Sequence, residues 1–340
     1  MGLTRRSVGA RALDRGLSFC ENDKIIALAG NPNVGKSTVF NGLTGLHQHT
    51  GNWPGKTVTN AVGICRSSKT QYQLVDIPGT YSLMAHSAEE EVARNFICFG
   101  DPDAVLVVCD ATCLERNLNL VLQAIETGKR VLVCVNLMDE AERKGITLDL
   151  PLLSERLGVP VVGITARRKK DLARLLELLD QTVNTPASSP LVIRYPVAVE
   201  SALARLEPVL RAELGEPLSS RFTALKLLEQ DDGMQAELSR YHQKAIEESP
   251  AIQQALLSAR TDLQQAGITP DSLRDNIVSA LVTTAEQLCN GVVRYKRPTY
   301  NAADRRADRI LTGRLLGYPL MLLLLAVVFW LTITGANAPS

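Results

Sequence analysis

Short runs of β-branched and aliphatic residues alternate with segments of helical periodicity over residues 24–182. The apolar runs lack a strict polar–apolar alternation, which is typical of strands buried on both faces of a parallel sheet. This repeated order of strand and helix predicts a doubly wound α/β domain. The predicted strands are KIIALAG, QYQLVDIPG, AVLVVCD, RVLVCVN and VPVVGIT, and the predicted helices lie near residues 36–43, 89–99, 114–127, 150–157 and 172–183.

The pattern also separates further regions of the chain. Within the α/β domain of residues 24–183, Gly, Asn, Pro and Thr crowd residues 44–60 and predict a long functional loop. Residues 184–196 begin with NTPASSP, a composition typical of a linker. Residues 197–298 have apolar positions at three- and four-residue spacing and predict a small all-α domain. Residues 1–23 are rich in arginine but have no apolar core, so a basic disordered tail is favoured over an organelle transit peptide.

The end of the chain is almost entirely apolar. Residues 315–335 read LLGYPLMLLLLAVVFWLTITG, without one charged side chain. A stretch of about 20 such residues matches the thickness of a bilayer and predicts one transmembrane helix. The preceding residues 299–314 form a basic juxtamembrane segment with four arginines. By the positive-inside rule, residues 1–314 are expected to be cytoplasmic.

Composition argues against two classes of protein. The chain has 37 basic and 36 acidic residues, and this balance argues against a nucleic-acid-binding surface spread over the whole chain. Its seven cysteines form no CxxC pair, and their number is odd. In a chain of this length that favours free thiols in a reducing cytosol over a disulfide framework or a zinc site.

The segment GNPNVGKST directly follows a predicted strand and opens a predicted helix, the context in which GxxxxGK[ST] indicates a P-loop. Backbone amides of such a loop, together with the helix N-terminus, bind phosphate. We expect Lys36 to reach the β- and γ-phosphates and Ser37 to ligate Mg²⁺. The predicted nucleotide contacts in this motif are Gly30, Asn31, Asn33, Val34, Gly35, Lys36, Ser37 and Thr38.

The segment DIPG ends the second predicted strand. Asp76 is expected to hold Mg²⁺ through water, and the Gly79 amide to meet the γ-phosphate. In the loop before it, Thr57 is favoured over Thr59 as the threonine that closes on Mg²⁺ and the γ-phosphate, with Gly55 as a further nucleotide contact. The predicted catalytic residues are Lys36, Thr57 and Gly79.

Thr80 follows DIPG, at a position where many GTPases have a glutamine that orients the attacking water. Slow intrinsic hydrolysis is therefore expected. A membrane-tethered, nucleotide-gated switch with little hydrolysis stays open as an alternative.

The segment NLMD follows a later strand and selects the base. Asp139 can accept hydrogen bonds from the two donors of guanine, whereas adenine would turn a lone pair towards the carboxylate. GTP is therefore predicted over ATP, with Asn136 and Leu137 as further contacts. After the last strand, the ITARR segment is expected to contact the guanine through Thr165 and Ala166. These motifs, in this order, predict a Ras-like P-loop GTPase.

With these motifs in place, the chain resembles the bacterial ferrous iron transport protein B (FeoB) family from about residue 24 to residue 335. The resemblance rests on GNPNVGKST, GNWPGKTV, DIPGTYSL, NLMDEAERKGITLDL and the DRILTGRLLGYPLMLLLLAVVFWLT segment. It implies a cytoplasmic GTPase domain, a helical domain similar to a guanine-dissociation inhibitor, and a polytopic membrane domain that moves Fe²⁺. It also implies K⁺-stimulated hydrolysis, with K⁺ held by Asn33 and by backbone carbonyls around Gly51 and Trp53.

The chain departs from this family in three ways. It ends after one predicted membrane helix, as expected of a fragment or a split gene product, so the remaining spans lie outside it. It has the basic extension before Lys24, and it reads TVTN where the family often has TVE.

The sequence therefore predicts a GTPase that drives or gates ferrous iron uptake across the bacterial inner membrane, with GTP or GDP, Mg²⁺ and K⁺ as its ligands. The lipid bilayer, small Feo accessory proteins and further copies of the chain are the expected partners. An assembly or signalling GTPase is the remaining alternative, and the near-neutral charge and the apolar C-terminal segment speak against it.

Overall fold

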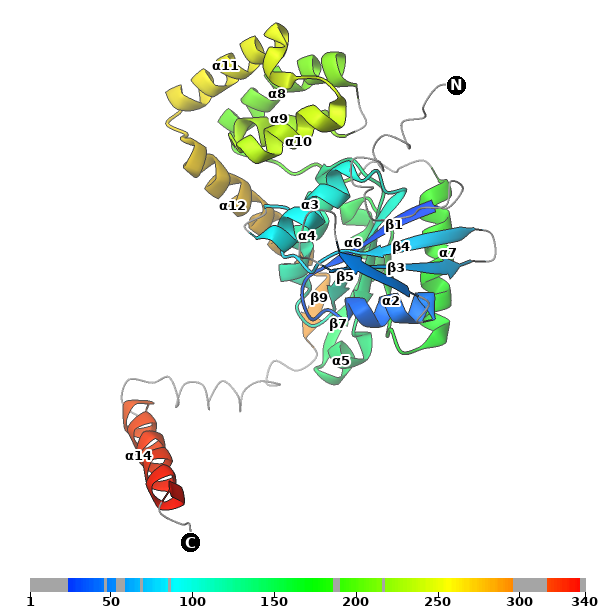
Figure 1. Ribbon diagram of the computed structural model, residues 1–340, viewed down its shortest axis with the longest axis vertical. Coiled ribbons are helices and arrows are strands. Elements are labelled where there is room, and N and C mark those ends of the chain that lie inside the picture. Colours follow the sequence, from blue (N-terminus) through cyan, green and yellow to red (C-terminus); the bar gives the residue numbers. More distant parts are fainter. Residues whose placement is uncertain are drawn as a thin grey trace.

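The computed structural model describes residues 24–45, 48–52, 59–67, 70–84, 87–185, 190–215, 218–295 and 317–336. Over this part of the chain, a sheet with helices on both faces is followed by a group of helices (Figure 1). The predicted tail of residues 1–23 and the basic segment of residues 299–314 lie outside the described residues.

The main sheet has seven strands in the order β2-β3-β4-β1-β5-β6-β8 (Figure 1). The five strands from β4 to β8 run parallel, while β3 is antiparallel to β4 and β2 is antiparallel to β3. The bounds are β1 (Lys24–Gly30), β2 (Gln48–Asn52), β3 (Thr59–Arg66), β4 (Gln71–Asp76), β5 (Ala104–Asp110), β6 (Val131–Asn136) and β8 (Val161–Gly163).

Both faces of this sheet are buried, as the apolar runs predict. Along β1, Ile26 and Leu28 belong to one core and Ala27 and Ala29 to the other, and all four side chains are fully buried. The first core is covered by α2 (Lys36–Thr44) and α7 (Lys169–Asn184), and the second by α3 (Ala88–Phe99), α4 (Leu114–Glu126) and α6 (Leu150–Leu157). The prediction of a Ras-like α/β sheet is thereby confirmed.

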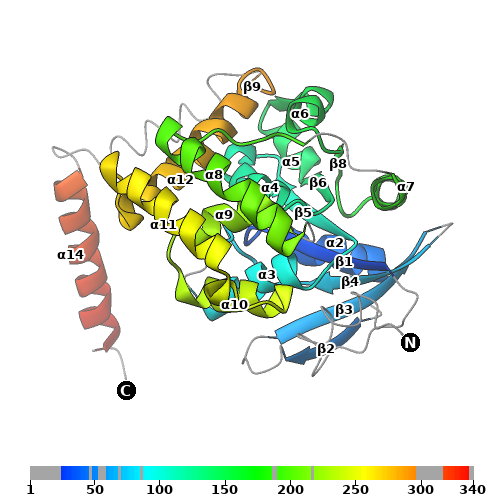
Figure 2. The ribbon, with the colours of Figure 1, turned by 90° about the horizontal axis from the view of Figure 1, so that it is seen from above.

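The predicted helical region is confirmed as well. It comprises α8 (Val197–Leu214), α9 (Ser220–Leu228), α10 (Asp232–His242), the 3-10 turn η1 (Ile246–Glu248), α11 (Pro250–Gln265) and α12 (Pro270–Cys289). These helices share one continuous core with α3 and α4, and Figure 2 shows the two parts side by side. Helix α12 returns to pack against α4 and α6.

Some elements are missing from the sequence-based prediction. Residues 44–60, predicted as a long loop, contain β2 and the start of β3. The sequence-based prediction missed these strands. Two short strands, β7 (Ile146–Leu148) and β9 (Val293–Tyr295), pair antiparallel although 145 residues separate Leu148 from Val293. A short helix, α5 (Met138–Arg143), precedes β7. Pairing with a distant partner stabilises such strands, and a local pattern does not contain that information.

The apolar C-terminal segment contains the helix α14 (Gly317–Ala336). Its described apolar side chains are largely exposed, for example Met321 and Trp330. Within the described part of the chain, no helix meets the length and apolarity needed to cross a bilayer. The transmembrane helix expected over residues 315–335 therefore stays a prediction.

Candidate functional site

The loop between β1 and α2 makes a tight turn that needs a glycine. Asn33 and Gly35 have φ angles of 67° and 82°. A Cβ atom on Gly35 would lie 2.4 Å from Nδ2 of Asn136, so no larger residue fits without moving that side chain. The Gly35 carbonyl accepts from the amides of Thr38 at 3.0 Å and Val39 at 3.1 Å and so begins α2. The P-loop predicted from the sequence therefore has the turn and the helix N-terminus that bind phosphate.

Lys36 and Asp76 lie in contact, although 40 residues separate them along the chain. The Lys36 ammonium binds the Asp76 carboxylate and donates to the Ile77 carbonyl at 2.7 Å. Burial raises the pKa of Asp76, and the nearby Lys36 charge opposes that rise without cancelling it. Ser37 is exposed in the first turn of α2. One carboxylate and one hydroxyl are hard oxygen donors, which fit a Mg²⁺ ion that takes its other ligands from phosphate and water.

Two backbone hydrogen bonds hold the DIPG segment beside the P-loop. The Ile77 amide donates to the Leu28 carbonyl at 3.3 Å, and the Thr80 amide donates to the Gly30 carbonyl at 3.2 Å. A Cβ atom on Gly79 would touch Pro32 at 3.4 Å, so Gly79 lies directly against the P-loop.

Thr80 is fully buried. Its hydroxyl donates to the Ser82 carbonyl at 2.5 Å and accepts from the Ser82 amide at 3.3 Å. The side chain that replaces the usual glutamine is thus engaged within its own turn. Its single hydroxyl donor is therefore used within that turn.

Asn136 joins the P-loop to the loop that follows the last strand. Its Nδ2 donates to the Val34 carbonyl at 3.0 Å, and its Oδ1 accepts from the Ala166 amide at 3.1 Å. The side chain is only 1% exposed. The predicted phosphate and base segments therefore meet at one residue, and here Asn136 organises the site through both ends of its amide.

The base segment is arranged around the start of α5. Leu137 has a φ of 62° and directly precedes this helix, which places Asp139 in its first turn. The Met138 amide donates to the Ile164 carbonyl at 3.3 Å, so this turn lies against the loop that carries Thr165. The Thr165 amide in turn donates to Oδ2 of Asp171 at 2.8 Å.

Asp171 is a site residue that the motifs do not reveal. It lies in the first turn of α7, and its hydrogen bond to the Thr165 amide fixes the loop whose Ala166 amide contacts Asn136. Asp171 directly precedes the predicted helix of residues 172–183, and an acidic residue at the start of a helix is the sequence signal that could have found it.

The other predicted site residues divide into two groups. Asn31 is buried in the P-loop, Thr38 is exposed on α2, and Gly51 lies in β2 opposite Asn60. The second group, whose placement falls outside the described residues, consists of Trp53, Gly55 and Thr57.

Comparison with known proteins places both parts of the chain in one family. A family model described as "Ferrous iron transport protein B" matches residues 24–179, and one described as "FeoB cytosolic helical domain" matches residues 195–294. The chain is 34% identical over 326 residues to an "Fe(2+) transport protein A/Fe(2+) transporter FeoB fusion protein" of Porphyromonas gingivalis, covering 92% of this chain and 37% of that protein. It is 32% identical over 318 residues to the Fe(2+) transporter FeoB of Escherichia coli K12, covering 92% of this chain and 39% of that protein.

Solved structures agree with these matches. A mutant of the S. thermophilus NFeoB bound to GDP is 32% identical, with a TM-score of 0.69, over 80% of this chain and 100% of that one. The cytosolic domain of L. pneumophila FeoB is 29% identical, with a TM-score of 0.65, over 80% of this chain and 100% of that one. This chain spans 37–39% of the length of the full-length transporters named above.

Proposed function

Because the chain belongs to the ferrous iron transport protein B family, we propose that it binds and hydrolyses GTP and thereby drives or gates ferrous iron uptake across the bacterial inner membrane. The observation that carries this proposal is the meeting of phosphate and base segments at Asn136. A similar structure, that of the S. thermophilus protein, holds GDP.

In this proposal, the phosphates lie over the P-loop turn at Gly35 and the N-terminus of α2. Lys36 exchanges its contact with Asp76 for the β- and γ-phosphates, which leaves the Asp76 carboxylate free for a cation. Ser37, Asp76 and Thr57 would hold Mg²⁺, which when bound neutralises charge on the phosphates. The Gly79 amide would then contact the γ-phosphate.

The guanine is proposed to bind between α5 and the loop before α7. Asp139 accepts from the two donors on the base, and the Ala166 amide donates to its carbonyl oxygen. The Oδ1 atom of Asn136 accepts a hydrogen bond from that amide and fixes its position. Adenine would leave the Asp139 carboxylate without hydrogen-bond donors, and this unfavourable unpaired group makes the site selective for guanine.

The test of this function is nucleotide competition on the whole chain. Labelled GDP should bind with Mg²⁺ and be displaced by GTP but not by an equal concentration of ATP. Asp139→Asn should exchange guanine for xanthine nucleotides, with a loss of guanine affinity on the order of 10⁴-fold. Displacement of GDP by ATP would show that the assignment of the base is wrong.

The alternative to this proposal is a nucleotide-gated switch with little hydrolysis, and the engaged Thr80 hydroxyl favours that alternative. The rate of GTP hydrolysis separates the two. We propose slow turnover that K⁺ stimulates, with Asn33 and the carbonyls of Gly51 and Trp53 around the ion. The ion would supply positive charge where the transition state develops negative charge. Turnover should be slower in Na⁺ than in K⁺, and Asn33→Ala should remove the difference. Equal rates in both salts for the unmodified chain would contradict the K⁺ site.

The membrane part of the proposal rests on residues 315–335, which would span the bilayer and keep residues 1–314 in the cytoplasm. Spans outside this chain would provide the path for Fe²⁺. Small accessory proteins and further copies of the chain are the proposed partners. The full chain should sediment with membranes and resist a high-salt wash, whereas a chain ending at Pro298 should stay in solution and still bind GDP. Release of the full chain by salt would indicate surface attachment instead.

A further inference from the structure

Asn31, the second residue of the GNPNVGKST segment, has a buried side chain without a polar partner. The residue is 3% exposed, and neither Oδ1 nor Nδ2 has a hydrogen-bond partner within the part of the chain that the structure describes. Both atoms are also shielded from solvent. A carboxamide can donate two hydrogen bonds and accept others, and it is unfavourable to leave them unmade in the interior. An apolar side chain of the same size would avoid this cost.

A second buried asparagine, Asn117 in α4, shows what a structural role looks like. It is 2% exposed, so its burial matches that of Asn31. Its Oδ1 accepts from the Asp110 amide at 3.2 Å, and its Nδ2 donates to the Cys113 carbonyl at 2.8 Å. Burial therefore does not by itself explain why Asn31 is unpaired. A side chain that lowers stability where it lies is typical of a functional site.

The neighbours of Asn31 along the chain lie against the DIPG segment. The Gly30 carbonyl accepts from the Thr80 amide at 3.2 Å, and Gly79 lies directly against the P-loop. The carbonyls of Pro78 and Gly79 accept no hydrogen bond from the described residues. A donor without an acceptor and two acceptors without a donor therefore lie in adjoining segments. In P-loop GTPases, the segment after the Mg²⁺-binding aspartate rearranges when the γ-phosphate binds.

We infer that Asn31 is a positioning residue for GTP hydrolysis. When the γ-phosphate binds the Gly79 amide, Nδ2 of Asn31 donates to the carbonyl of Pro78 or of Gly79 and holds the DIPG segment in that position. Thr80 stands in place of the usual glutamine, and its single donor is used within its own turn. The backbone of the DIPG segment therefore takes over the orientation of the attacking water. This inference rests on the proposed hydrolysis of GTP and deepens it.

The step that depends on this position is the transfer of the γ-phosphoryl group to water. The water oxygen bonds to the γ-phosphorus while the bond between that phosphorus and the bridging oxygen breaks, and the bridging oxygen leaves on GDP with the electron pair. One hydrogen of the water stays in the new P–OH group, and the other passes to a phosphate oxygen. Asn31 takes no part in these bond changes. It fixes the backbone that orients the water, so its loss should lower kcat and leave KM nearly unchanged.

The test compares Asn31→Leu with Asn117→Leu in the full chain. Asn31→Leu removes the carboxamide at similar size, and kcat should fall roughly ten-fold, the factor expected for one buried hydrogen bond. KM for GTP and the affinity for GDP should stay within about two-fold. The thermal midpoint of Asn31→Leu should rise by about 2 °C, because no polar group is left unpaired. Asn117→Leu removes two hydrogen bonds, so its midpoint should fall by about 2 °C or more while kcat stays within about two-fold.

A second variant, Asn31→Ala, guards against a clash of the leucine side chain and should show the same loss of kcat. Normal kcat in both Asn31 variants would overturn this inference and leave the proposed function intact. Weaker GDP binding by both variants, in step with the loss of turnover, would identify a general structural role in the P-loop and would overturn it as well. Failure of the unmodified chain to hydrolyse GTP would overturn both the inference and the proposed function.

Discussion

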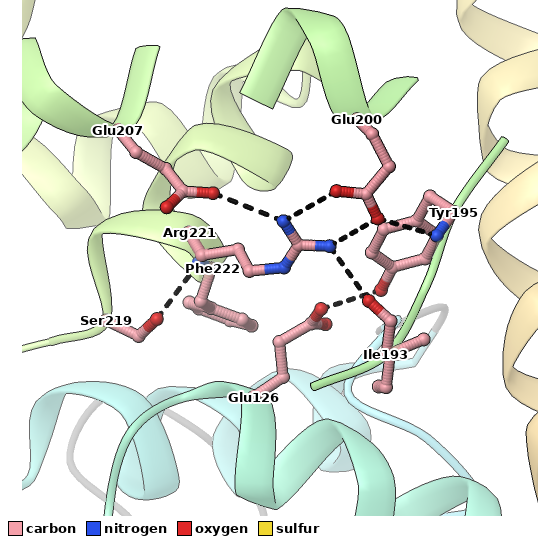
Figure 3. Close-up of polar contacts among 8 residues, drawn as sticks. All are labelled: Glu126, Ile193, Tyr195, Glu200, Glu207, Ser219, Arg221 and Phe222. Atoms are coloured by element: carbon pink, nitrogen blue, oxygen red, sulfur yellow. Dashed lines mark hydrogen bonds and ion pairs between the residues drawn. The ribbon is translucent and has the colours of Figure 1, made fainter. Parts of the chain in front are cut away.

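Asp76 and Glu200 are two carboxylates that each pair with a cationic side chain. The two pairs differ in how far the partner offsets the cost of burying the carboxylate. Asp76 at the end of β4 binds the ammonium of Lys36, and burial still raises its pKa. Glu200 in the helical region is also partly buried, and burial alone would raise its pKa. Hydrogen bonds from Arg221 and from the Tyr195 amide, together with the Arg221 charge, outweigh burial and lower that pKa. The partners of Glu200 (Figure 3) therefore outweigh the effect of its burial, whereas the Lys36 charge does not outweigh the burial of Asp76.

This difference separates a ligand site from a structural cluster. A carboxylate that is bound on both oxygens by a guanidinium gains little from a further cation. A buried carboxylate whose partner is a single lysine ammonium is stabilised much more by a further cation, because the second positive charge offsets the cost of burial. Function is therefore expected at Asp76 and stability at Glu200, and substitutions should separate the two.

The largest effect is expected at Asp76. Asp76→Asn keeps the shape but removes the charge that would hold Mg²⁺, so GTP turnover should fall on the order of 100-fold. Its stability should change by less than about 1 kcal/mol, because the ionised form of a carboxylate with a raised pKa does not favour the folded state. Turnover assays and urea denaturation measure the two quantities. Asp262→Asn, at an exposed ion pair of the helical region, is the control. A large loss of stability with normal turnover would break the comparison.

The opposite result is expected at Arg221. Arg221→Met removes the guanidinium that donates to Glu200, Glu207 and the Ile193 carbonyl, and should lower the free energy of unfolding by about 2 kcal/mol, less than for a fully buried pair. GDP affinity should stay within about two-fold. Arg240→Met, which breaks an exposed pair with Glu237, should cost at most about 0.5 kcal/mol. Equal destabilisation by both substitutions would show that the cluster is not structural.

Acid should affect the two carboxylates in different pH windows. The pKa of Asp76 in the folded protein is raised above the usual aspartate value of about 3.9. As the pH falls, Asp76 therefore takes up its proton before that value is reached. Mg²⁺-dependent GDP affinity should therefore decline first. The folded pKa of Glu200 is lowered, so its stabilising contribution is present above about 4.3 and is lost only below that value. GDP titrations and circular dichroism along one pH series would reveal the order, and coincident transitions would contradict it.

A smaller effect tests how firmly the base loop is held. Asp171→Ala removes the acceptor of the Thr165 amide, and should weaken GDP binding by roughly five-fold through a looser Ala166 position. Glu177→Ala, on the exposed side of the same helix, is the control and should bind GDP normally. Calorimetric titration measures both, and unaltered binding by Asp171→Ala would show that the loop does not depend on this bond.

The sequence by itself determined the parallel strands, the helical region and the order of the nucleotide motifs. These features are local, because each motif is a short run at the end of a strand. Parallel strands bring their carboxyl ends to one edge of the sheet, and Lys36, Asp76 and Asn136 each lie at or just after the end of such a strand. The short buried apolar runs predicted the strands, because strand formation in a buried sheet is visible in a local run of residues.

Only the tertiary structure decided which residues hold that edge together. Asn136 reaches a carbonyl 102 residues away and an amide 30 residues away, and Gln123 reaches an amide 40 residues away. Strands β7 and β9 pair although helices α8 to α12 lie between them along the chain. Arg221 binds partners from α8 and from the segment that precedes it. In each case a polar group is satisfied by a partner that packing brings near, and packing depends on the whole core rather than on any local run of residues.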